Sequence, residues 1–282
     1  MSPRIRAGMD QGTAEAAELP GAVPDLLNFP VSERAAIDER EERKRRRQER
    51  KQFGPEWVDT PSSRQVFAAL AAAREWGEIA VIHGGTGVGK TMASRRYAEE
   101  CENVWIAVMS LPANRMRPCL QEVASAFRLP HMRGGAHRLH LEIVNRMRWT
   151  GGLLIVDEAQ HLGHPQLEAL RGLYDASGCG LALLGNDQFG SRIEHAPKFA
   201  ALASRVGYRV HLPRAKAKDV RAVLDAWGVE GEEARESGRR LAEPPGGLRR
   251  LVRALERRAR ASGKGEAAER PRKRRSQSGG AA

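Results

Sequence analysis

Residues Gly84 to Thr91 have the composition of a loop that binds phosphate groups. They read Gly-Gly-Thr-Gly-Val-Gly-Lys-Thr and fit the pattern G-x-x-x-x-G-K-[ST]. Glycines let backbone N–H groups curl around phosphate oxygens without interference from a Cβ atom. The lysine ammonium would reach the β- and γ-phosphates of ATP, and the threonine hydroxyl would bind Mg²⁺. The sequence therefore predicts a cofactor site made of Gly84, Gly85, Thr86, Gly87, Val88, Gly89, Lys90 and Thr91.

A second constellation pairs two carboxylates at the end of an apolar segment. Leu153–Val156 is followed directly by Asp157 and Glu158, which is the arrangement of a Walker B motif. Asp157 would hold Mg²⁺, and Glu158 would polarise the water that attacks the γ-phosphate. The pair therefore predicts Mg²⁺-dependent hydrolysis of ATP.

These motifs need a scaffold of alternating strands and helices. The phosphate loop lies between an apolar strand, Ile79–His83, and a predicted helix, Lys90–Glu100. Further strands are predicted over Val104–Met109, Gly152–Val156, Leu181–Leu184 and Val206–Leu212, and helices over Arg115–Phe127, Arg138–Trp149, Pro165–Tyr174 and around Phe199. Continuous apolar strands that alternate with helices indicate an α/β fold with a parallel sheet covered on both faces.

Helical signals stand on either side of this alternating region. Asp59-Thr60-Pro61 predicts a helix start with Thr60 as its N-cap, and with Val66, Phe67 and Leu70 facing inward. After Pro213 the strand signals stop. Two sets of apolar residues then recur at i, i+3, i+4 and i+7, which predicts amphipathic helices; they are Val220, Val223, Leu224 and Trp227, and Leu248, Leu251, Val252 and Leu255.

Composition and charge divide the chain into four predicted parts. These are a flexible charged segment at 1–53, an α/β nucleotide-binding domain at 54–213, a small helical lid at 214–262 and a disordered basic tail at 263–282. No apolar run reaches the ~18 residues that span a bilayer. The three cysteines are scattered and form no CxxC pair. We therefore expect no membrane span, no disulfide framework, and a cytoplasmic protein.

The order of these motifs resembles that of the AAA+ ATPases, over residues of about 58–260. In that family a polar residue called sensor 1 follows the next strand after Walker B, and here it is Asn186. The resemblance implies that Asn186 orients the attacking water or touches the γ-phosphate. It also implies a P-loop sheet followed by a helical lid.

Two arginines match further positions of the AAA+ pattern. Gly246-Gly247-Leu248-Arg249 looks like sensor 2, which makes Arg249 the nucleotide-contacting residue, although the adjacent Arg250 leaves the assignment open by one position. Arg205, directly before the last predicted strand, occupies the position of an arginine finger. The resemblance implies that Arg205 acts on the ATP of a neighbouring copy.

Two short segments narrow the resemblance. Asp157–Leu162 (Asp-Glu-Ala-Gln-His-Leu), followed by Leu184–Asp187, is similar to the DNA-transposition ATPases typified by phage Mu transposition protein B. This likeness implies a homo-oligomer, in a ring or a helical filament, that forms on duplex DNA with ATP. It also implies delivery of target DNA to a transposase, or activation of that transposase. Residues 1–53 depart from the pattern, because they show no periodic helices of a helix-turn-helix domain.

The charge distribution agrees with a nucleic-acid partner. The chain carries a formal net charge of +12, and seven arginines lie between residues 115 and 148 against Glu122 and Glu142. The resemblance places loops Ser110–Pro118 and Arg128–Arg138 at a central channel. It thereby predicts DNA contacts by Arg115, Arg117, Arg133 and Arg138. Forked guanidinium donors suit phosphate oxygens, so binding to double-stranded DNA should be weakly sequence-specific and salt-sensitive.

Two other functions remain open from the sequence. One is an AAA+ ATPase of a non-transposition pathway, either secretion-associated or helicase-loader-like, because Asp-Glu-Ala-Gln also occurs in such relatives. The other is a nucleotide-dependent protein-interaction module in which hydrolysis is incidental. DNA-stimulated hydrolysis would distinguish the DNA-acting proteins from such a module.

Overall fold

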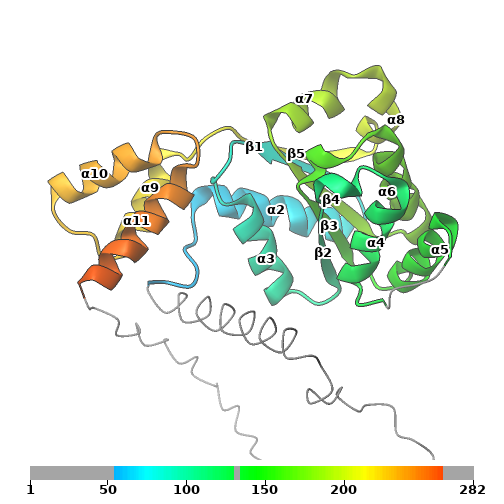
Figure 1. The fold of residues 1–282 in the computed structure, drawn as a ribbon, viewed down its shortest axis with the longest axis horizontal. Coiled ribbons are helices and arrows are strands. Elements are labelled where there is room, and N and C mark those ends of the chain that lie inside the picture. The colour runs from blue at the N-terminus through cyan, green and yellow to red at the C-terminus, as the bar shows by residue number, and fades with distance from the viewer. Residues whose placement is uncertain (1–53, 130–133, 263–282) are drawn as a thin grey trace, which may run out of the picture. The chain divides into compact units, whose positions relative to one another are not determined.

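The computed structural model of the chain describes residues 54–129 and 134–262 (Figure 1). The predictions made for residues 1–53 and 263–282, and for Arg133, lie outside the described residues.

Five parallel strands form one sheet in the order β2–β3–β4–β1–β5. They are β1 (Ile79–Gly84), β2 (Val104–Val108), β3 (Leu153–Asp157), β4 (Gly180–Gly185) and β5 (Val206–Leu212). Consecutive residues of β3 point to opposite faces, so that Leu154 and Val156 join one apolar cluster while Leu153 and Ile155 join another. Both faces are buried, and the predicted parallel α/β fold is confirmed.

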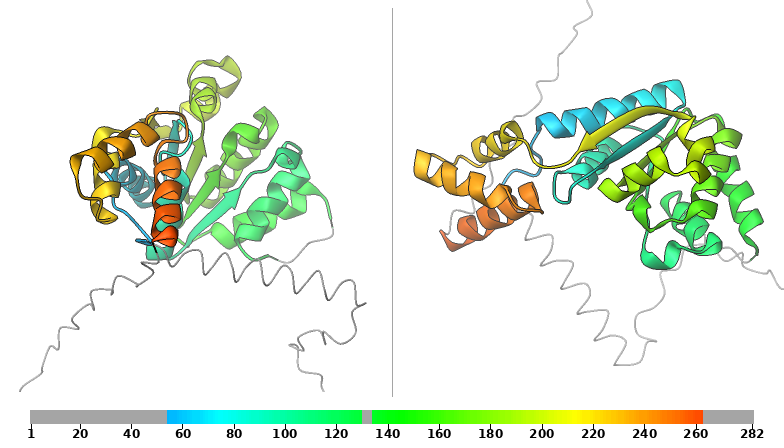
Figure 2. Two further views of the ribbon diagram at one scale, coloured as in Figure 1. Left: turned by 60° about the vertical axis from the view of Figure 1, so that its left-hand side comes forward. Right: turned by 90° about the horizontal axis from the view of Figure 1, so that it is seen from above.

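Helices cover both faces of this sheet. One face packs against α2 (Pro61–Trp76) and α3 (Lys90–Glu100). The other packs against α4 (Met116–Ala126), α5 (Ala136–Met147), α6 (His164–Ser177), α7 (Asp187–His195) and α8 (Ala200–Ala203). Figure 2 shows α2 and the green helices on opposite sides of the strands. Three short 3₁₀ turns connect these elements at Leu111–Ala113 (η3), Ala159–His161 (η4) and Pro197–Phe199 (η5).

The predicted start of α2 is confirmed. The Thr60 hydroxyl accepts a hydrogen bond from the Ser63 backbone N–H at 3.1 Å, and the Ser63 hydroxyl oxygen accepts one from the Thr60 N–H at 2.9 Å. Pro61 occupies the first turn, where its missing N–H costs nothing. Val66 and Leu70 are fully buried, and Phe67 packs at the edge of the same cluster.

Three helices after the sheet have an apolar core of their own. They are α9 (Ala217–Ala226), α10 (Glu232–Ala242) and α11 (Gly247–Ala261). The predicted apolar positions of α9 and α11 meet in this core, whose fully buried members include Leu224 and Leu251. The sequence did not predict α10, because its Glu- and Arg-rich surface leaves a short apolar stripe in which Gly238 packs against Leu224.

A buried carboxylate joins these helices to the sheet domain. Asp219, at the start of α9, has no exposed surface. Its oxygens accept hydrogen bonds from the Ser62 N–H at 2.8 Å, the Ser62 hydroxyl at 2.7 Å and the Lys216 N–H at 2.9 Å. The first turns of α2 and α9 are therefore held together.

The region between β4 and β5 differs from its prediction. In place of one helix around Phe199, the chain forms α7, the short turn η5 and then α8, with Phe199 buried at their junction.

Within the described ranges, no helix is long and apolar enough to cross a lipid bilayer.

Candidate nucleotide-binding site

The strand order brings the phosphate loop, the two Walker B carboxylates and Asn186 to the carboxyl ends of neighbouring strands. Strands β3, β4 and β1 are neighbours and all run in the same direction. The phosphate loop follows β1, Asp157 ends β3 and is followed by Glu158, and Asn186 follows β4. Carboxyl ends of neighbouring parallel strands form the crevice where α/β proteins bind ligands.

Two glycines of the phosphate loop are required by close backbone contacts. Gly84 has φ 147° and Gly87 has φ 72°, a region that L-residues with side chains rarely adopt. A Cβ on Gly84 would lie 2.0 Å from the Leu212 carbonyl oxygen, and one on Gly87 would lie 2.4 Å from that of Gly246. The loop therefore runs tightly between the end of β5 and the start of α11.

Lys90 opens α3 with its side chain folded over the loop. Its ammonium donates to the carbonyl oxygens of Gly84 at 2.9 Å and Gly85 at 2.7 Å. A bound triphosphate would offer phosphate oxygens to the same donors. The lysine is thus already aimed at the loop that would hold the phosphates.

The charges around Lys90 show which residues meet there. Burial lowers the pKa of Lys90, and the nearby Asp157, Asp187 and Glu158 partly offset this by favouring the ammonium form. Arg249 acts in the opposite direction on the same group. Residues from β3, α7 and α11 therefore contribute to the electrostatic field at the phosphate loop.

Asp157 has the surroundings of a ligand for a hard cation. It is buried, and its Oδ1 accepts a hydrogen bond from the Glu158 N–H at 2.9 Å. Its Oδ2 is buried without a hydrogen-bond partner among the described residues. Burial raises the pKa of Asp157, while the Thr91 side chain, the Glu158 N–H and Lys90 favour its ionised form. Carboxylate and hydroxyl oxygens suit Mg²⁺, so Thr91 and Asp157 fit the predicted metal.

Glu158 is held in an unusual backbone conformation. Its φ of 58° lies in the left-handed region, which costs a non-glycine residue free energy and is often found at active sites. Its carboxylate accepts a hydrogen bond from Gln160 Nε2. Gln160, on η4, was not singled out from the sequence, although it directly follows Ala159 in the Asp-Glu-Ala-Gln motif.

Asn186 is the N-cap of α7. Its Oδ1 accepts a hydrogen bond from the Phe189 N–H at 2.9 Å. This bond fixes the side chain at the carboxyl end of β4, between the strands that carry Asp157 and the phosphate loop. Because the amide oxygen is engaged in this way, the predicted contact with a γ-phosphate or an attacking water would have to come from the amide nitrogen.

The loop that begins α11 contacts the phosphate loop directly. The Gly246 N–H donates to the Thr86 carbonyl oxygen at 3.2 Å, and the Arg249 N–H donates to that of Gly87 at 3.3 Å. Arg249 also contributes to the field at Lys90. Of the two adjacent arginines, the geometry therefore favours Arg249 over Arg250 as the residue beside the nucleotide site.

Arg205 lies at the opposite end of the strands from the phosphate loop, beside their amino ends. The register pairs Val206 with Ile79, so Arg205 sits beside the amino end of β1. The length of β1 separates it from the phosphate loop, roughly 16 Å at ~3.3 Å per residue. Its guanidinium donates to Asp175 Oδ1 at 2.9 Å and to the Ala201 carbonyl at 2.9 Å. Arg205 is therefore too far from the phosphate loop of its own copy to contact a nucleotide bound there.

Three of the predicted DNA-contacting arginines lie near one another and are exposed. Arg117 donates to the Gly134 carbonyl oxygen, and a Cβ on Gly134 would lie 3.3 Å from the Arg138 side chain. Their placement in loops was wrong in part. Arg115 is the N-cap of α4, while Arg117 and Arg138 lie in the first turns of α4 and α5, because both helices begin at the predicted loops' ends.

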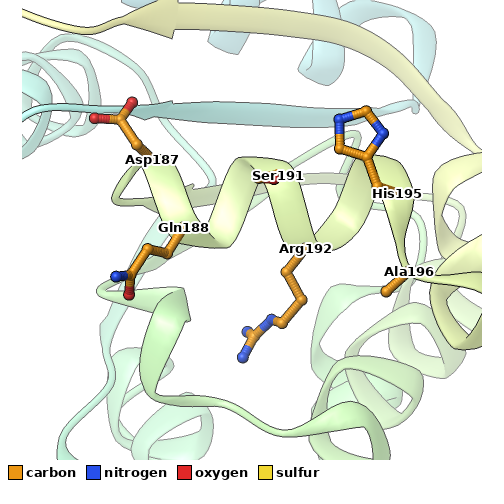
Figure 3. A pocket seen from close by; sticks show the side chains of 6 residues that line it. All are labelled: Asp187, Gln188, Ser191, Arg192, His195 and Ala196. Carbon is orange, nitrogen blue, oxygen red and sulfur yellow. The ribbon is translucent and has the colours of Figure 1, made fainter.

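The structure also brings together groups that the sequence did not point to. A pocket of about 620 Å³ is lined by Asp187, Gln188, Ser191, Arg192, His195 and Ala196 (Figure 3). The figure shows Asp187 and Arg192 pointing to different sides of α7. Arg192 donates to the Leu162 carbonyl oxygen at 2.9 Å. Asp187 also belongs to a cluster with His83 and His211, which only the register of the sheet could reveal.

Comparison with known proteins places the chain in a family. Residues 74–193 match the model of an AAA domain, and residues 204–273 match that of the Mu B transposition protein, C terminal. The chain is 36% identical over 219 residues to the ATP-dependent target DNA activator B of Escherichia phage Mu, covering 75% of this chain and 69% of that protein. The chain belongs to the Mu B family. It is also 36% identical over 206 residues to the Mu-like prophage FluMu DNA transposition protein B of Haemophilus influenzae, covering 70% and 71%.

Solved structures support the fold of this Mu B family member. The ORC2 protein of Aeropyrum pernix, in ADPNP and ADP complexes, aligns with a TM-score of 0.53 at 18% identity, covering 78% of this chain and 69% of that one. A replication initiator DnaA bound to AMPPCP and single-stranded DNA aligns with a TM-score of 0.50 at 14% identity, covering 74% and 67%. The predicted resemblance to AAA+ ATPases is confirmed at the level of family and fold.

Proposed function

We propose that this Mu B family chain binds Mg²⁺-ATP at the carboxyl edge of its sheet and hydrolyses it. The observation that carries the proposal is the convergence of Lys90, Asp157 and Glu158, with Asp157 Oδ2 buried and unpaired among the described residues. The backbone of the phosphate loop and Lys90 bind the phosphates. Thr91 and Asp157 hold Mg²⁺, which neutralises charge on the phosphate oxygens when bound.

The remaining residues orient the reaction. Glu158, fixed by Gln160, accepts a proton from the attacking water. Asn186 positions that water or the γ-phosphate. Arg249 adds positive charge from the lid, residues 214–262, to the site in the α/β domain, residues 54–213. Arg205 supplies a guanidinium to the nucleotide of the next copy, so hydrolysis belongs to a homo-oligomer.

We further propose that ATP-bound copies assemble on double-stranded DNA and deliver it to a transposase or activate that transposase. The curated relatives are called a target DNA activator and a DNA transposition protein, which favours this function over secretion or helicase loading. The exposed arginines Arg115, Arg117 and Arg138 offer phosphate contacts without base readout. Arg133 would extend this group. The cytoplasm is the expected compartment, because the DNA and the transposase are there.

Nucleotide-dependent retention of DNA tests the proposal. We expect the full chain to hold duplexes of unrelated sequence with ATP and Mg²⁺, to release them without nucleotide, and to hydrolyse ATP faster when DNA is added. Lys90→Ala should neither hold DNA when ATP is present nor hydrolyse ATP, because it removes the charge that bridges the phosphates. Lys218 is an exposed lysine on α9, so Lys218→Ala is the matched control and should behave as the parent. DNA retention that is equal with and without ATP would contradict the proposal.

A further inference from the structure

Two histidines and an aspartate meet beside the phosphate loop. His83 on β1 and His211 on β5 are register partners, and Asp187 is the first residue of α7. One nitrogen from each imidazole and one oxygen of the carboxylate all lie within 4.8 Å of one another. His211 Nε2 is 2.9 Å from Asp187 Oδ1, and His83 Nδ1 is 3.9 Å from the same oxygen.

The surroundings of His83 leave one of its nitrogens without a partner. Its Nδ1 is buried and makes no hydrogen bond to any described residue. A Cβ on Gly190 would lie 2.2 Å from this atom, so the glycine of α7 lets the imidazole approach the helix. A buried imidazole nitrogen without a hydrogen-bond partner calls for an explanation. Here it faces a carboxylate oxygen beyond hydrogen-bond distance, and both atoms could donate a lone pair to an ion placed between them.

We propose that His83, Asp187 and His211 bind a divalent transition-metal ion of the zinc class. Two imidazole nitrogens and one carboxylate oxygen are a donor set that zinc accepts, with water in a fourth position. Asp187 and His211 are each 54% exposed at their side chains, which gives the ion a route of entry and the water a place. Mg²⁺ prefers oxygen ligands, so the site should discriminate against the ion that accompanies ATP.

Binding requires one movement. The two imidazole rings are stacked, with centroids 4.6 Å apart and an interplanar angle of 16°. Rings that share an ion must each point a nitrogen lone pair toward it, so His211, the more exposed ring, has to turn away from this stacking. Burial, His211 and Lys90 lower the pKa of His83, while Asp187 and Glu194 raise it.

The site would join β5 to two elements that carry parts of the nucleotide site, β1 and the start of α7. His83 directly precedes Gly84 of the phosphate loop, and Asp187 directly follows Asn186. A bound ion would therefore tie the strand before the loop to the turn that carries Asn186. The binding of the ion itself does not depend on the function proposed above.

Metal titration of the full chain tests this inference. We expect one equivalent of Zn²⁺ to bind in competition with a chromophoric chelator, and Co²⁺ to give the visible absorption bands of a low-coordinate site. A large excess of Mg²⁺ should not displace either ion. His211→Gln keeps an amide that can donate to Asp187, and it should weaken Zn²⁺ binding at least about tenfold and abolish the Co²⁺ bands.

Two further variants decide whether the binding is at this site. Asp187→Asn should weaken Zn²⁺ as His211→Gln does, because it removes the anionic ligand. His195→Ala, whose side chain is 72% exposed and lies at the far end of α7, should bind as the parent does. Equal Zn²⁺ affinity in the parent and in His211→Gln, or no stoichiometric binding by the parent, would overturn the proposal. Circular dichroism of each variant checks that the fold is retained.

Discussion

Asp157 and Glu158 are adjacent carboxylates with different surroundings. Asp157 is buried, which raises its pKa, while the Thr91 side chain, the Glu158 N–H and Lys90 favour its ionised form. A bound cation would favour that form further. Glu158 is partly exposed and turned by its left-handed backbone toward Gln160. One residue is therefore suited to hold a metal ion and the other to accept a proton.

Glu158→Gln should separate ATP binding from hydrolysis. The amide keeps the shape of the side chain but loses the base, so we expect nucleotide affinity within about twofold of the parent and a hydrolysis rate reduced at least ~100-fold. Equilibrium binding of a fluorescent ATP analogue and a phosphate-release assay measure the two effects. Hydrolysis at the parent rate would show that Glu158 is not the base.

Residue types and spacing predicted most of the proposed nucleotide site, because each motif is a continuous stretch whose chemistry depends on local sequence. The phosphate loop and the Asp157–Glu158 pair are such stretches. The hydrogen bond from Gln160 and the cluster of His83, Asp187 and His211 were not predicted. Their members come together only through the left-handed turn at Glu158 and the pairing of β1 with β5.

At the scale of elements, the strands were predicted within a residue or two. Strands β1, β3 and β4 are apolar and buried between layers of helices, whereas β2 is mostly half-buried and β5 alternates buried or half-buried residues with exposed ones. Helix α10 and helix α7 were missed for a physical reason. The apolar stripe of α10 is short and is completed by Gly238, while α7 buries Phe189 and Ile193 among polar residues. Burial of these few apolar residues by neighbouring elements adds to the local charge and capping pattern of the two helices.

Asp219 should prove important for the joint between α2 and α9. Asp219→Ala removes the acceptor of three hydrogen bonds and leaves buried donors unpaired, so we expect the free energy of unfolding to fall by about 2–4 kcal/mol. Urea denaturation monitored by circular dichroism measures it. Asp225→Ala is the matched control, since the Asp225 carboxylate is exposed and its ion pair with the half-buried Arg235 should contribute less than about 1 kcal/mol.

At the scale of the whole molecule, the arginine cluster near the starts of α4 and α5 should hold DNA. Replacing Arg115, Arg117 and Arg138 together by glutamine should weaken duplex binding similarly on unrelated sequences. It should also reduce the steepness of the plot of log binding constant against log salt concentration, by about 0.9 in slope for each DNA phosphate that is no longer neutralised. Fluorescence anisotropy over a range of salt concentrations measures both.

A second triple variant shows whether the position of the charges matters. Arg253, Arg257 and Arg258 on α11 are exposed, and their replacement by glutamine changes the net charge equally. The α11 variant should retain more affinity than the first. Equal losses of affinity would mean that general charge, rather than this cluster, holds DNA.

A fragment of residues 54–262 tests the contribution of the two ends of the chain. If the fragment fails to bind duplex DNA in the presence of ATP, DNA binding would be assigned to the basic runs Arg43–Arg47 and Arg270–Arg275.

Arg205 should act between copies. Arg205→Ala is expected to bind ATP normally and to hydrolyse it poorly, since its guanidinium lies at the edge opposite its own phosphate loop. Mixing it with Glu158→Gln should restore part of the activity, because some interfaces then pair an intact Arg205 with an intact Glu158. Co-assembly without any recovery of phosphate release would argue against this role.

The placement of Arg205 and the phosphate loop at opposite edges of one sheet gives an assembly a direction. If the amino edge of each copy meets the carboxyl edge of the next, the contact is head-to-tail and the two ends of an open filament differ. The copy at one end then holds ATP that no Arg205 can reach. The copy at that end should hydrolyse ATP slowly and stay bound to DNA, while the other copies hydrolyse their ATP. The filament would therefore shorten from its other end, and its growth on DNA would be polar.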